Sequence, residues 1–385
     1  MSSDINKSNE TVVNKSVIEE ESNLDTLILI NDIEVQNLIP IFVTVGIFMF
    51  VGIVGNTLVV QVYWCRMKRS AKRTFILSLA LLDLGVCLLV IPFEMYDLRN
   101  QVLFFQEGLC KAMRVLEYAT VLAAGFVLVS VSFERYYFLC RAFQEFSPHK
   151  AKLICVICVV AALLVSSPAA IFAGSKSRNI EHNGQLYTGF ECSMNSEQNA
   201  DGTLKRVYYY VLAIIFFGCL LVFVVLYAMI GRLLWKYQKG KFLPQIGSLA
   251  KSSTKRSYEA QEVKLTAHNS SGRLPVFSSS HKERHVHGNR CIKSAGTIVV
   301  FFSVTVVFVL SFLPHLAIRL VMFLDLNLQS DMDQRTWGLL YNFTVRSYLI
   351  SNVANPFIYS ILNKSFRKQL KRTIRFIRQC GPETI

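Results

Sequence analysis

The sequence predicts an all-α membrane protein, a bundle of seven transmembrane helices, and two observations lead to this class. Charged residues make up only 17% of the chain and hydrophobic residues 52%, whereas a soluble protein carries about 25% charged residues. The apolar residues also gather in stretches of about 20 or more, the length that crosses the hydrocarbon layer as a helix. A water-soluble helical enzyme is disfavoured, because its buried helices contain only about 10–14 consecutive apolar residues.

The predicted spans follow one another along the chain, separated by polar segments. They cover residues 38–64, 74–96, 109–138, 151–173, 207–234, 295–324 and 336–361. The first, fourth and fifth are almost free of charge. An ionisable side chain is costly inside a membrane, so the ionisable residues of the other four spans are candidates for function.

The distribution of charge predicts the orientation. The amino-terminal tail holds eight acids against Lys7 and Lys15. The segment after the first span contains five bases and no acid, and the segments after the fifth and seventh spans are also basic. Positively charged loops stay in the cytosol, so we expect the amino terminus outside the cell and the carboxyl terminus inside. We attribute the net charge of +15 to this topology and to contact with membrane lipids, and expect no binding of nucleic acid.

This topology divides the chain into three parts. Residues 1–37 are expected to form an unstructured extracellular tail, residues 38–362 the membrane domain, and residues 363–385 an amphipathic helix with a cytosolic tail. Within the membrane domain, the polar, Ser-rich residues 236–292 are expected to be a largely disordered cytosolic loop. No cleavable signal peptide is recognisable, so the first span is expected to target the chain to the membrane.

Several residues are candidates for covalent modification. Asn6, Asn9 and Asn14 lie in glycosylation sequons of the outer tail. Of ten cysteines, only Cys110 and Cys192 lie on the outer side, where disulfides form. A bridge between them would tie the loop after the fourth span to the outer end of the third. Cys380 follows a basic amphipathic stretch and is a candidate for palmitoylation.

Characteristic residues occur inside the spans in a defined order. They are Asn56 in the first span, Asp83 in the second, Glu134-Arg135-Tyr136 closing the third, Tyr227 in the fifth, Phe308, Phe312 and Pro314 in the sixth, and Asn352 with Asn355-Pro356-Phe357-Ile358-Tyr359 in the seventh. In this order, and on these sides of the membrane, they resemble the rhodopsin-like family of G-protein-coupled receptors over residues 38–378. The resemblance implies a plasma-membrane receptor that binds an extracellular ligand and activates a heterotrimeric G protein by an outward swing of helix six. It also implies arrestin and receptor kinases as partners, and no enzymatic activity.

The resemblance assigns a switch to the cytosolic half. Arg135 would dock the G protein, and Glu134 would hold it until activation. Pro314 lacks an N–H and kinks its helix. The full set implied is Glu134, Arg135, Tyr136, Tyr227, Phe308, Phe312, Pro314, Asn355, Pro356 and Tyr359, with Tyr359 expected to meet Tyr227 in the active state. Ser294 stands where the family often has a second acid, so we expect measurable signalling without ligand.

A second implied site lies in the middle of the membrane. Asp83, Asn56, Ser351, Asn352 and Asn355 resemble the water and sodium cluster of the family. A carboxylate in a bilayer needs a cation or hydrogen-bond donors. The expected cofactor is therefore none beyond an allosteric sodium ion at Asp83. Ala124 stands where a serine is usual, which leaves this match incomplete.

Other departures make the chain a divergent member. Cys158 and Phe312 stand where the family usually has tryptophan, and Cys219 replaces the usual proline of helix five. Serines and threonines gather in residues 236–292 rather than in the final tail, so we expect arrestin and the kinase to act on that loop.

The outer half suggests the ligand. Asn183-Gly184 is a type I′ hairpin signal, and its flanks 178–182 and 185–192 are expected to pair as a lid, which is typical of peptide-binding members. Ionisable and polar residues share helix faces in the outer thirds of the spans. The candidate ligand contacts are Glu94, Asp97, Arg114, Glu117, Tyr118, His315, Arg319, Asn342 and Arg346. We expect a neuropeptide or peptide hormone that carries both a basic and an acidic group.

Other ligands and another class stay open at this point. A small anion could use the arginines, and a biogenic amine could use Glu117, which occupies the place of the amine-binding aspartate. Retinal is excluded because Leu349 replaces the required lysine. A membrane transporter would show internal repeats or a relay of ionisable groups through the bilayer, and neither is visible.

Overall fold

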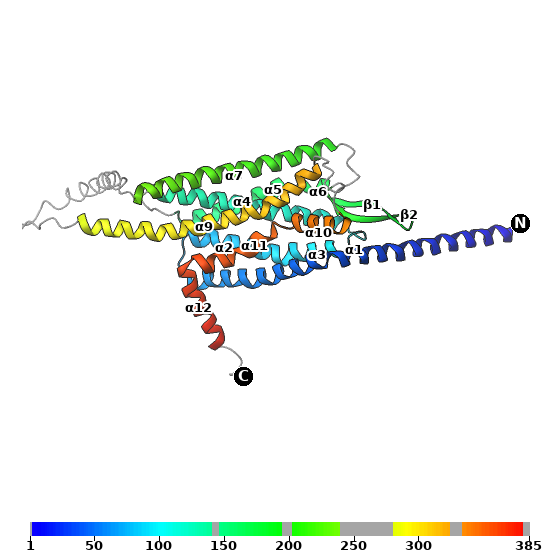
Figure 1. The fold of residues 1–385 in the computed structure, drawn as a ribbon, viewed down its shortest axis with the longest axis horizontal. Coiled ribbons are helices and arrows are strands. Elements are labelled where there is room, and N and C mark those ends of the chain that lie inside the picture. Colours follow the sequence, from blue (N-terminus) through cyan, green and yellow to red (C-terminus); the bar gives the residue numbers. More distant parts are fainter. Residues whose placement is uncertain (1, 141–145, 195–201, 239–279, 324–332, 380–385) are drawn as a thin grey trace, which may run out of the picture.

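The computed structural model describes residues 2–140, 146–194, 202–238, 280–323 and 333–379, with the backbone alone for 2–22, 202, 237–238, 280–295, 323, 334 and 376–379. Long helices lie side by side in one bundle (Figure 1). A β-hairpin and the amino-terminal end of α1 lie at one end of the bundle, here called the hairpin end. Helix α12 crosses the opposite end, here called the α12 end.

The elements follow the chain in a simple order. They are α1 (Ser2–Arg66), α2 (Ala71–Gly85), the π-helix η1 (Val86–Val90), α3 (Ile91–Arg99), α4 (Glu107–Cys140), α5 (Pro148–Ser166), α6 (Ala169–Phe172), β1 (Gly174–His182), β2 (Gln185–Ser193), α7 (Gly202–Gln238), α9 (Ser280–Phe323), α10 (Gln334–Val345), α11 (Leu349–Leu362) and α12 (Lys364–Gln379).

Six helical segments of the described chain are long and apolar enough to cross a membrane. They are Ile39–Arg66, Ala71–Arg99, Glu107–Cys140, Pro148–Phe172, Thr203–Lys236 and Gly296–Met322. They match the first six predicted spans. Large apolar side chains on them are exposed, such as Ile214 at 71% and Leu164 at 69%, as expected of helices whose surroundings are lipid.

The seventh predicted span is divided. Residues 336–361 were expected as one helix, but α10 ends at Val345 and α11 begins at Leu349. The intervening backbone is a tight turn of i to i−3 hydrogen bonds, for example from Leu349 N to Arg346 O at 3.0 Å. The Arg346 side chain is drawn into a cluster of acids, described below.

A proline also shapes α11. Pro356 has no N–H, so the carbonyl of Asn352, four residues earlier, receives no helical hydrogen bond from it. The side chain of Asn56 on α1 donates to that carbonyl instead, at 2.9 Å. Asn56 therefore joins α1 to α11 by satisfying a group that proline leaves open.

The segment before the first span differs from the prediction. An unstructured tail was expected over residues 1–37, whereas α1 runs unbroken from Ser2 into the first span. From residue 23 onward the side chains explain part of this helix. Leu27 and Ile30 are buried, which anchors two turns of α1 beyond the predicted membrane boundary.

The polar side of this extension is anchored as well. Asn31 is 1% exposed. Its amide donates to the carbonyl of Arg99 at 3.0 Å and accepts from the N–H of Val102 at 3.3 Å. These partners are backbone groups of the loop after α3, so nothing in the composition of the tail reveals them.

The long polar loop is described only at its edges. Helix α7 continues to Gln238 and α9 begins at Ser280, so both helices extend into the predicted loop of residues 236–292. Its remaining residues lie outside the described chain.

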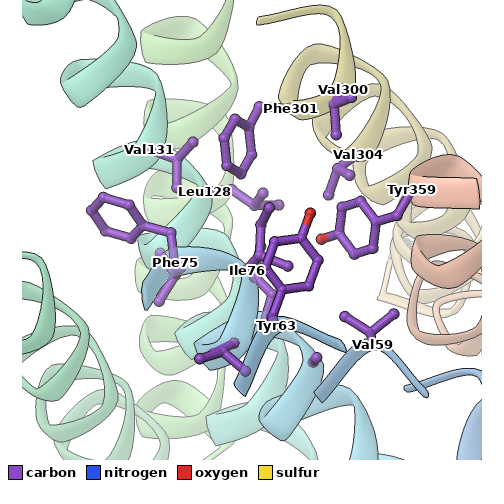
Figure 2. Close-up of a cluster of buried hydrophobic side chains, with 14 of the residues drawn as sticks. Val59, Tyr63, Phe75, Ile76, Leu128, Val131, Val300, Phe301, Val304 and Tyr359 are labelled. Carbon is purple, nitrogen blue, oxygen red and sulfur yellow. The ribbon is translucent and has the colours of Figure 1, made fainter. Parts of the chain in front are cut away.

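Aromatic and branched side chains fill the α12 half of the bundle (Figure 2). Tyr63, Tyr359 and Phe366 pack together, with ring centroids 5.8–6.2 Å apart. Asn363 Nδ2 donates to the Tyr63 hydroxyl at 2.8 Å. Because Phe366 belongs to α12, this cluster fixes α12 against α1 and α11.

Candidate ligand and coupling sites

The predicted hairpin is present and longer than expected. Strands β1 and β2 pair antiparallel from Gly174–Ser193 to His182–Gln185. Asn183 and Gly184 have φ of 52° and 76°, the positive values that a type I′ turn requires at both central positions. The dipeptide signal therefore located the turn correctly.

Two links hold the hairpin on the bundle. A disulfide joins Cys110 at the start of α4 to Cys192 in β2, as predicted. The backbone of Phe190 exchanges hydrogen bonds with Val102 and Phe104, at 2.8 and 2.9 Å. Gly189 makes this approach possible, because a Cβ there would lie 2.7 Å from the Val102 carbonyl.

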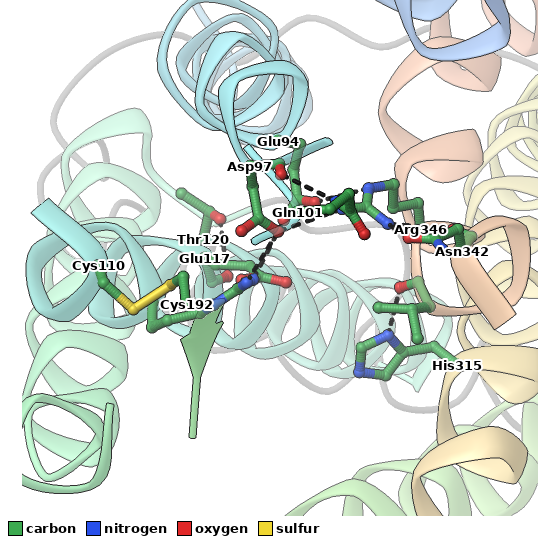
Figure 3. Close-up of polar contacts among 12 residues, drawn as sticks. Glu94, Asp97, Gln101, Cys110, Glu117, Thr120, Cys192, His315, Asn342 and Arg346 are labelled. Carbon is green, nitrogen blue, oxygen red and sulfur yellow. Dashed lines mark hydrogen bonds and ion pairs between the residues drawn. A yellow bond between two sulfur atoms is a disulfide. The ribbon is translucent and has the colours of Figure 1, made fainter. Parts of the chain in front are cut away.

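At the hairpin end, Arg114 is the centre of an acidic cluster, and Figure 3 shows the three acids, Glu94, Asp97 and Glu117, close to one another. Its Nη1 donates to Glu117 at 2.8 Å and to Glu94 at 3.3 Å, and its Nη2 donates to Asp97 at 3.2 Å. Glu94 is 1% exposed and Glu117 5%. Buried carboxylates are tolerated only with such partners.

Arg346 approaches the same acids from the turn between α10 and α11. Its Nε lies 2.7 Å from Glu94 Oε2 and its Nη2 lies 3.3 Å from Asp97 Oδ2. Its Nη1 donates to the Asn342 side chain at 2.7 Å. Three acids and two arginines from three parts of the chain thus form one network, here called the five-charge cluster (Glu94, Asp97, Arg114, Glu117 and Arg346).

Arg319 on α9 has a different environment. No carboxylate of the described residues lies within 4 Å of it, and its buried Nε has no hydrogen-bond partner among them. It interacts electrostatically with Tyr341, Tyr118 and Tyr209, and over a distance of more than 4 Å with the carboxylate of Glu117. Arg319 is therefore the sixth charge that the sequence predicted here, and it has no carboxylate within 4 Å among the described residues.

The remaining predicted contacts lie beside these charges. Tyr118 packs edge-on against Tyr208, with centroids 6.4 Å apart. His315 Nδ1 donates to the carbonyl of Val345 at 2.6 Å. The His315 ring stacks on Phe312 at 5.2 Å and meets Tyr348 edge-on at 5.5 Å. All nine predicted ligand contacts thus lie toward the hairpin end, and Asn342 acts there as a support for Arg346.

Sequence reasoning missed several neighbours. Tyr209 and Tyr341 were not singled out, although both interact with Arg319. The run Tyr208-Tyr209-Tyr210 at the start of the fifth span was a usable signal, because a tyrosine at a span end has both an apolar ring and a polar hydroxyl.

A small cavity lies deeper in the bundle. Its volume is about 20 Å³, and its lining includes Asp83, Ser351, Asn352, Asn355 and Phe312. That volume holds about one water or a small ion. Asn355 donates to Asp83 Oδ2 at 2.8 Å, so the predicted cluster converges on one carboxylate.

The donor set fits a monovalent cation. One carboxylate, one hydroxyl and two side-chain amides supply oxygen ligands, which suit a hard cation. Asn56 lies beside the cluster and bonds the Asn352 backbone. No group of three His, Cys, Asp or Glu side chains suited to a metal occurs in the part of the chain that the structure describes.

The predicted coupling residues lie toward the α12 end. Arg135 is 2% exposed and Glu134 is fully buried. The two form an ion pair between adjacent residues of α4. The Arg135 guanidinium also lies 5.3 Å from the Phe138 ring and 5.6 Å from the ring of Phe301 on α9. Arg135 therefore contacts the helix that is expected to move.

The other switch residues have separate partners here. Tyr227 shares a hydrogen bond with Thr305 of α9 at 3.1 Å, while Tyr359 packs in the aromatic cluster of Figure 2. Phe308 and Phe312 stack with centroids 6.4 Å apart, in the two turns of α9 that precede Pro314. The expected meeting of Tyr227 with Tyr359 is thus not present in this conformation.

Some predicted residues lie outside what the structure describes. The side chains of Asn6, Asn9, Asn14 and Ser294 are not described, and Cys380 lies beyond the last described residue. Glycosylation, palmitoylation and the expected effect of Ser294, which stands where the family often has a second acid, remain predictions.

Comparison with known proteins identifies the family of the chain. A family model described as the seven-transmembrane receptor of the rhodopsin family matches residues 55–359. The neuropeptide receptor npr-1 of Caenorhabditis elegans is 25% identical over 343 residues, covering 86% of this chain and 72% of that protein. The cholecystokinin receptor type A of Canis lupus familiaris is 24% identical over 365 residues, covering 88% of this chain and 81% of that protein. The family match includes Asp83, Arg135 and Pro356, and it covers most of the sequence. The chain belongs to the rhodopsin family of seven-transmembrane receptors.

Proposed function

We propose that the chain is a plasma-membrane receptor for an extracellular peptide that carries both an acidic and a basic group. It has its amino terminus outside the cell and activates a heterotrimeric G protein. The observation that carries this proposal is Arg319, a largely buried arginine beside a charge-paired network, with no carboxylate within 4 Å in the part of the chain that the structure describes. The names of the relatives at 24–25% identity also favour a peptide.

The arrangement of charge distinguishes the ligand classes. A buried arginine without a counter-ion favours a ligand acid, since a charge-assisted hydrogen bond in a desolvated site is strong. The tyrosines that interact with Arg319 can donate to the same acid. A basic group of the peptide would interact with the five-charge cluster, which holds three acids against two arginines.

A biogenic amine is less well supported. The residue that would bind it, Glu117, already accepts from Arg114 at 2.8 Å. An amine would have to displace that arginine or share the carboxylate with it. A small anion satisfies Arg319 as well as a peptide does, but it gives no role to the hairpin that covers this end.

Signalling would proceed from the α9 contacts of Arg135. Arg135 is held by Glu134 and lies against Phe301, an arrangement suited to a receptor that is not coupled. Outward movement of α9 about Pro314 would separate Phe301 from Arg135 and open a groove at the α12 end for the G protein. Tyr227 would leave Thr305 and approach Tyr359 in the same movement.

A sodium ion at Asp83 is part of the proposal. Asp83, Ser351, Asn352 and Asn355 would hold it, and its positive charge would stabilise the buried carboxylate. Phe312 lines the same cavity, so an ion held there would favour the uncoupled arrangement. Arrestin and a receptor kinase are proposed to act on residues 236–292.

The test is a peptide-library screen of cells expressing the chain, with calcium and cAMP as readouts. We expect active peptides to carry an acidic group. Arg319→Ala should lower the potency of such a peptide about tenfold, equivalent to about 1.4 kcal/mol. Neutralising the peptide acid should cause a similar loss on the wild type and little further loss on Arg319→Ala. Glu117→Gln should lower the potency through the basic group.

The opposite result is equally clear. The peptide proposal is wrong if a biogenic amine activates the receptor at low concentration and both Arg319→Ala and Arg346→Ala leave its potency unchanged.

A further inference from the structure

At the α12 end of the bundle, a hydrogen bond joins α2 to α9. Lys72 Nζ, in the first turn of α2, donates to Thr297 Oγ1 at 2.9 Å. Both residues are half-buried, so water competes only in part for the ammonium group and the hydroxyl. The bond connects the helix that is proposed to move during signalling to a helix that is proposed to stay in place.

The α2 side of this bond is fixed by the fold. The Ser70 side chain caps α2 by accepting from the N–H of Arg73 at 3.2 Å. The Arg73 side chain donates to the carbonyls of Tyr63 and Trp64, at 2.7 and 2.9 Å, where α1 ends. Lys72 therefore extends from a helical turn that α1 holds in place.

The α9 side lies at the end of a long lever. In the proposed mechanism α9 swings outward about Pro314, and Thr297 lies about 25 Å along the helix from that proline. Thr305, which shares a hydrogen bond with Tyr227, lies only about 13 Å from it. A rotation of about 10° would therefore displace Thr297 by about 4 Å and Thr305 by about 2 Å.

A displacement of about 4 Å breaks the bond to Thr297, because the donor–acceptor distance of a good hydrogen bond stays below about 3.2 Å. The lysine stem is flexible, so it can follow small fluctuations of α9 but not a swing of this size. The bond thus stabilises the uncoupled arrangement and is lost in the coupled one.

The sequence gives a reason for a lock at this position. Ser294, where the family often has an acid, lies one turn before Thr297, and residues three apart share a helix face. The Thr297 hydroxyl offers a neutral acceptor on that face, and Lys72 supplies the donor. A neutral acceptor holds a lysine less strongly than a carboxylate does, which agrees with the ligand-independent signalling expected from the sequence.

We infer that the Lys72–Thr297 hydrogen bond is a lock that holds α9 in the uncoupled position and opens during activation. The inference rests on the outward movement of α9 in the proposed function. It assigns control of that movement to a residue pair that is separate from Glu134 and Arg135.

The test follows α9 without a ligand or a G protein. Ile298 is 4% exposed and packs against Leu139 of α4 and Ile230 of α7. Ile298→Cys therefore introduces a thiol that becomes accessible when α9 moves away from those helices. Full-length receptor in lipid nanodiscs is treated with a maleimide, and peptide mapping by mass spectrometry gives the labelling rate at residue 298 alone. All variants are compared in this background.

The first variants remove one partner of the bond at a time. Lys72→Met and Thr297→Val should each raise the labelling rate about fivefold, equivalent to about 1 kcal/mol. The double variant should raise it no further, because the same bond is lost. Thr297→Ser keeps the hydroxyl and should label at the wild-type rate. The matched control is Lys68→Met, which removes the same charge from an exposed position in the turn before α2 and should also label at the wild-type rate.

A further variant tests the opposite direction. Thr297→Glu replaces the neutral acceptor with a carboxylate, so Lys72 should hold α9 more firmly and labelling should slow about threefold. This slowing should disappear when Lys72→Met is added. Ligand-independent cAMP and calcium signals, measured at matched expression, should follow the same order as the labelling rates.

Two results would overturn the inference. One is unchanged labelling, or additive increases, in Lys72→Met and Thr297→Val. The other is an equal increase in Lys68→Met, which would indicate an effect of net charge. Labelling that changes as expected while every variant fails to signal would support the lock and refute the proposed coupling to a G protein. Thermal unfolding checks that each variant is folded, and the comparison of Thr297→Val with Thr297→Ser decides the result if Lys72→Met is not.

Discussion

Glu34 in the extension of α1 holds Arg178 of strand β1 through two contacts, of 3.0 and 3.3 Å, between its carboxylate and the guanidinium. This pair connects a segment before the first span to the hairpin that covers the proposed ligand site. A bidentate pair between an arginine and a carboxylate fixes the relative orientation of the two side chains, in addition to its modest contribution to stability. The extension of α1 therefore helps to set the position of the hairpin.

We expect Glu34→Arg to lower the unfolding temperature of the purified receptor by about 2 °C, because partly exposed pairs contribute about 0.2–1 kcal/mol. Exchanging the charges, with Glu34→Arg and Arg178→Glu together, should restore it. Glu181→Arg is the control, a charge reversal at an exposed position of the same strand. Failure of the exchanged variant to recover stability would show that the pair does not hold the hairpin.

The disulfide should be required for a folded receptor. Cys110→Ala or Cys192→Ala opens a connection of 82 residues, and closing a flexible loop of that length stabilises a protein by about 4 kcal/mol. We expect little receptor at the cell surface, measured by antibody staining of intact cells. The double variant should be no worse than either single one, and Cys65→Ala should behave as the wild type. Peptide mapping that finds both thiols free in the native protein would contradict the prediction.

The two classes of arginine at the hairpin end should behave differently. Arg346→Ala leaves the buried Glu94 without its 2.7 Å partner, and breaking a buried pair costs about 3–5 kcal/mol. Arg319→Ala removes a cation that forms no ion pair within 4 Å with any described residue, so it should leave surface expression and the unfolding temperature nearly unchanged. Equal loss of stability in both variants would mean that Arg319 is also structural.

Arg135→Ala should abolish G-protein activation while the receptor still reaches the surface. Its side chain contacts Glu134 and two aromatic rings, so its removal affects coupling more than folding. Glu134→Gln should raise signalling without ligand, because the arginine loses its anionic partner. Cyclic AMP and calcium assays at matched expression test both. Normal signalling by Arg135→Ala would refute the coupling role, and a silent unliganded wild type would refute the expected basal activity.

Desensitisation of the receptor should depend on the loop of residues 236–292 rather than on the carboxyl-terminal tail. Phosphate adds about −1.5 to −2 charge and strong acceptors, which arrestin-type partners can bind. We expect alanine at Ser252, Ser253, Thr254, Ser278, Ser279 and Ser280 to impair arrestin recruitment more than deletion of residues 373–385. The reverse ranking would place the phosphorylation sites in the tail.

The sequence by itself determined the family, six spans, the hairpin turn and the disulfide partners. These features depend on local composition or on short motifs: apolar length for the spans, Asn183-Gly184 for the turn, and topology for Cys110 and Cys192. It also identified the charged residues that converge at the hairpin end, because spacing along a helix places side chains on a common face.

Only the tertiary structure decided which of those charges pair with one another. Arg114 and Arg346 lie far apart in the chain, yet they share Glu94 and Asp97, whereas Arg319 forms no ion pair with any residue that the structure describes. Spacing within one helix cannot show this, because pairing depends on the rotation of each helix and on the break of the seventh span at residues 346–348. The sequence did not predict the extension of α1 for the same reason. Asn31 and Glu34 bond to groups about 70 and 144 residues away, and these groups come close only once the chain is folded.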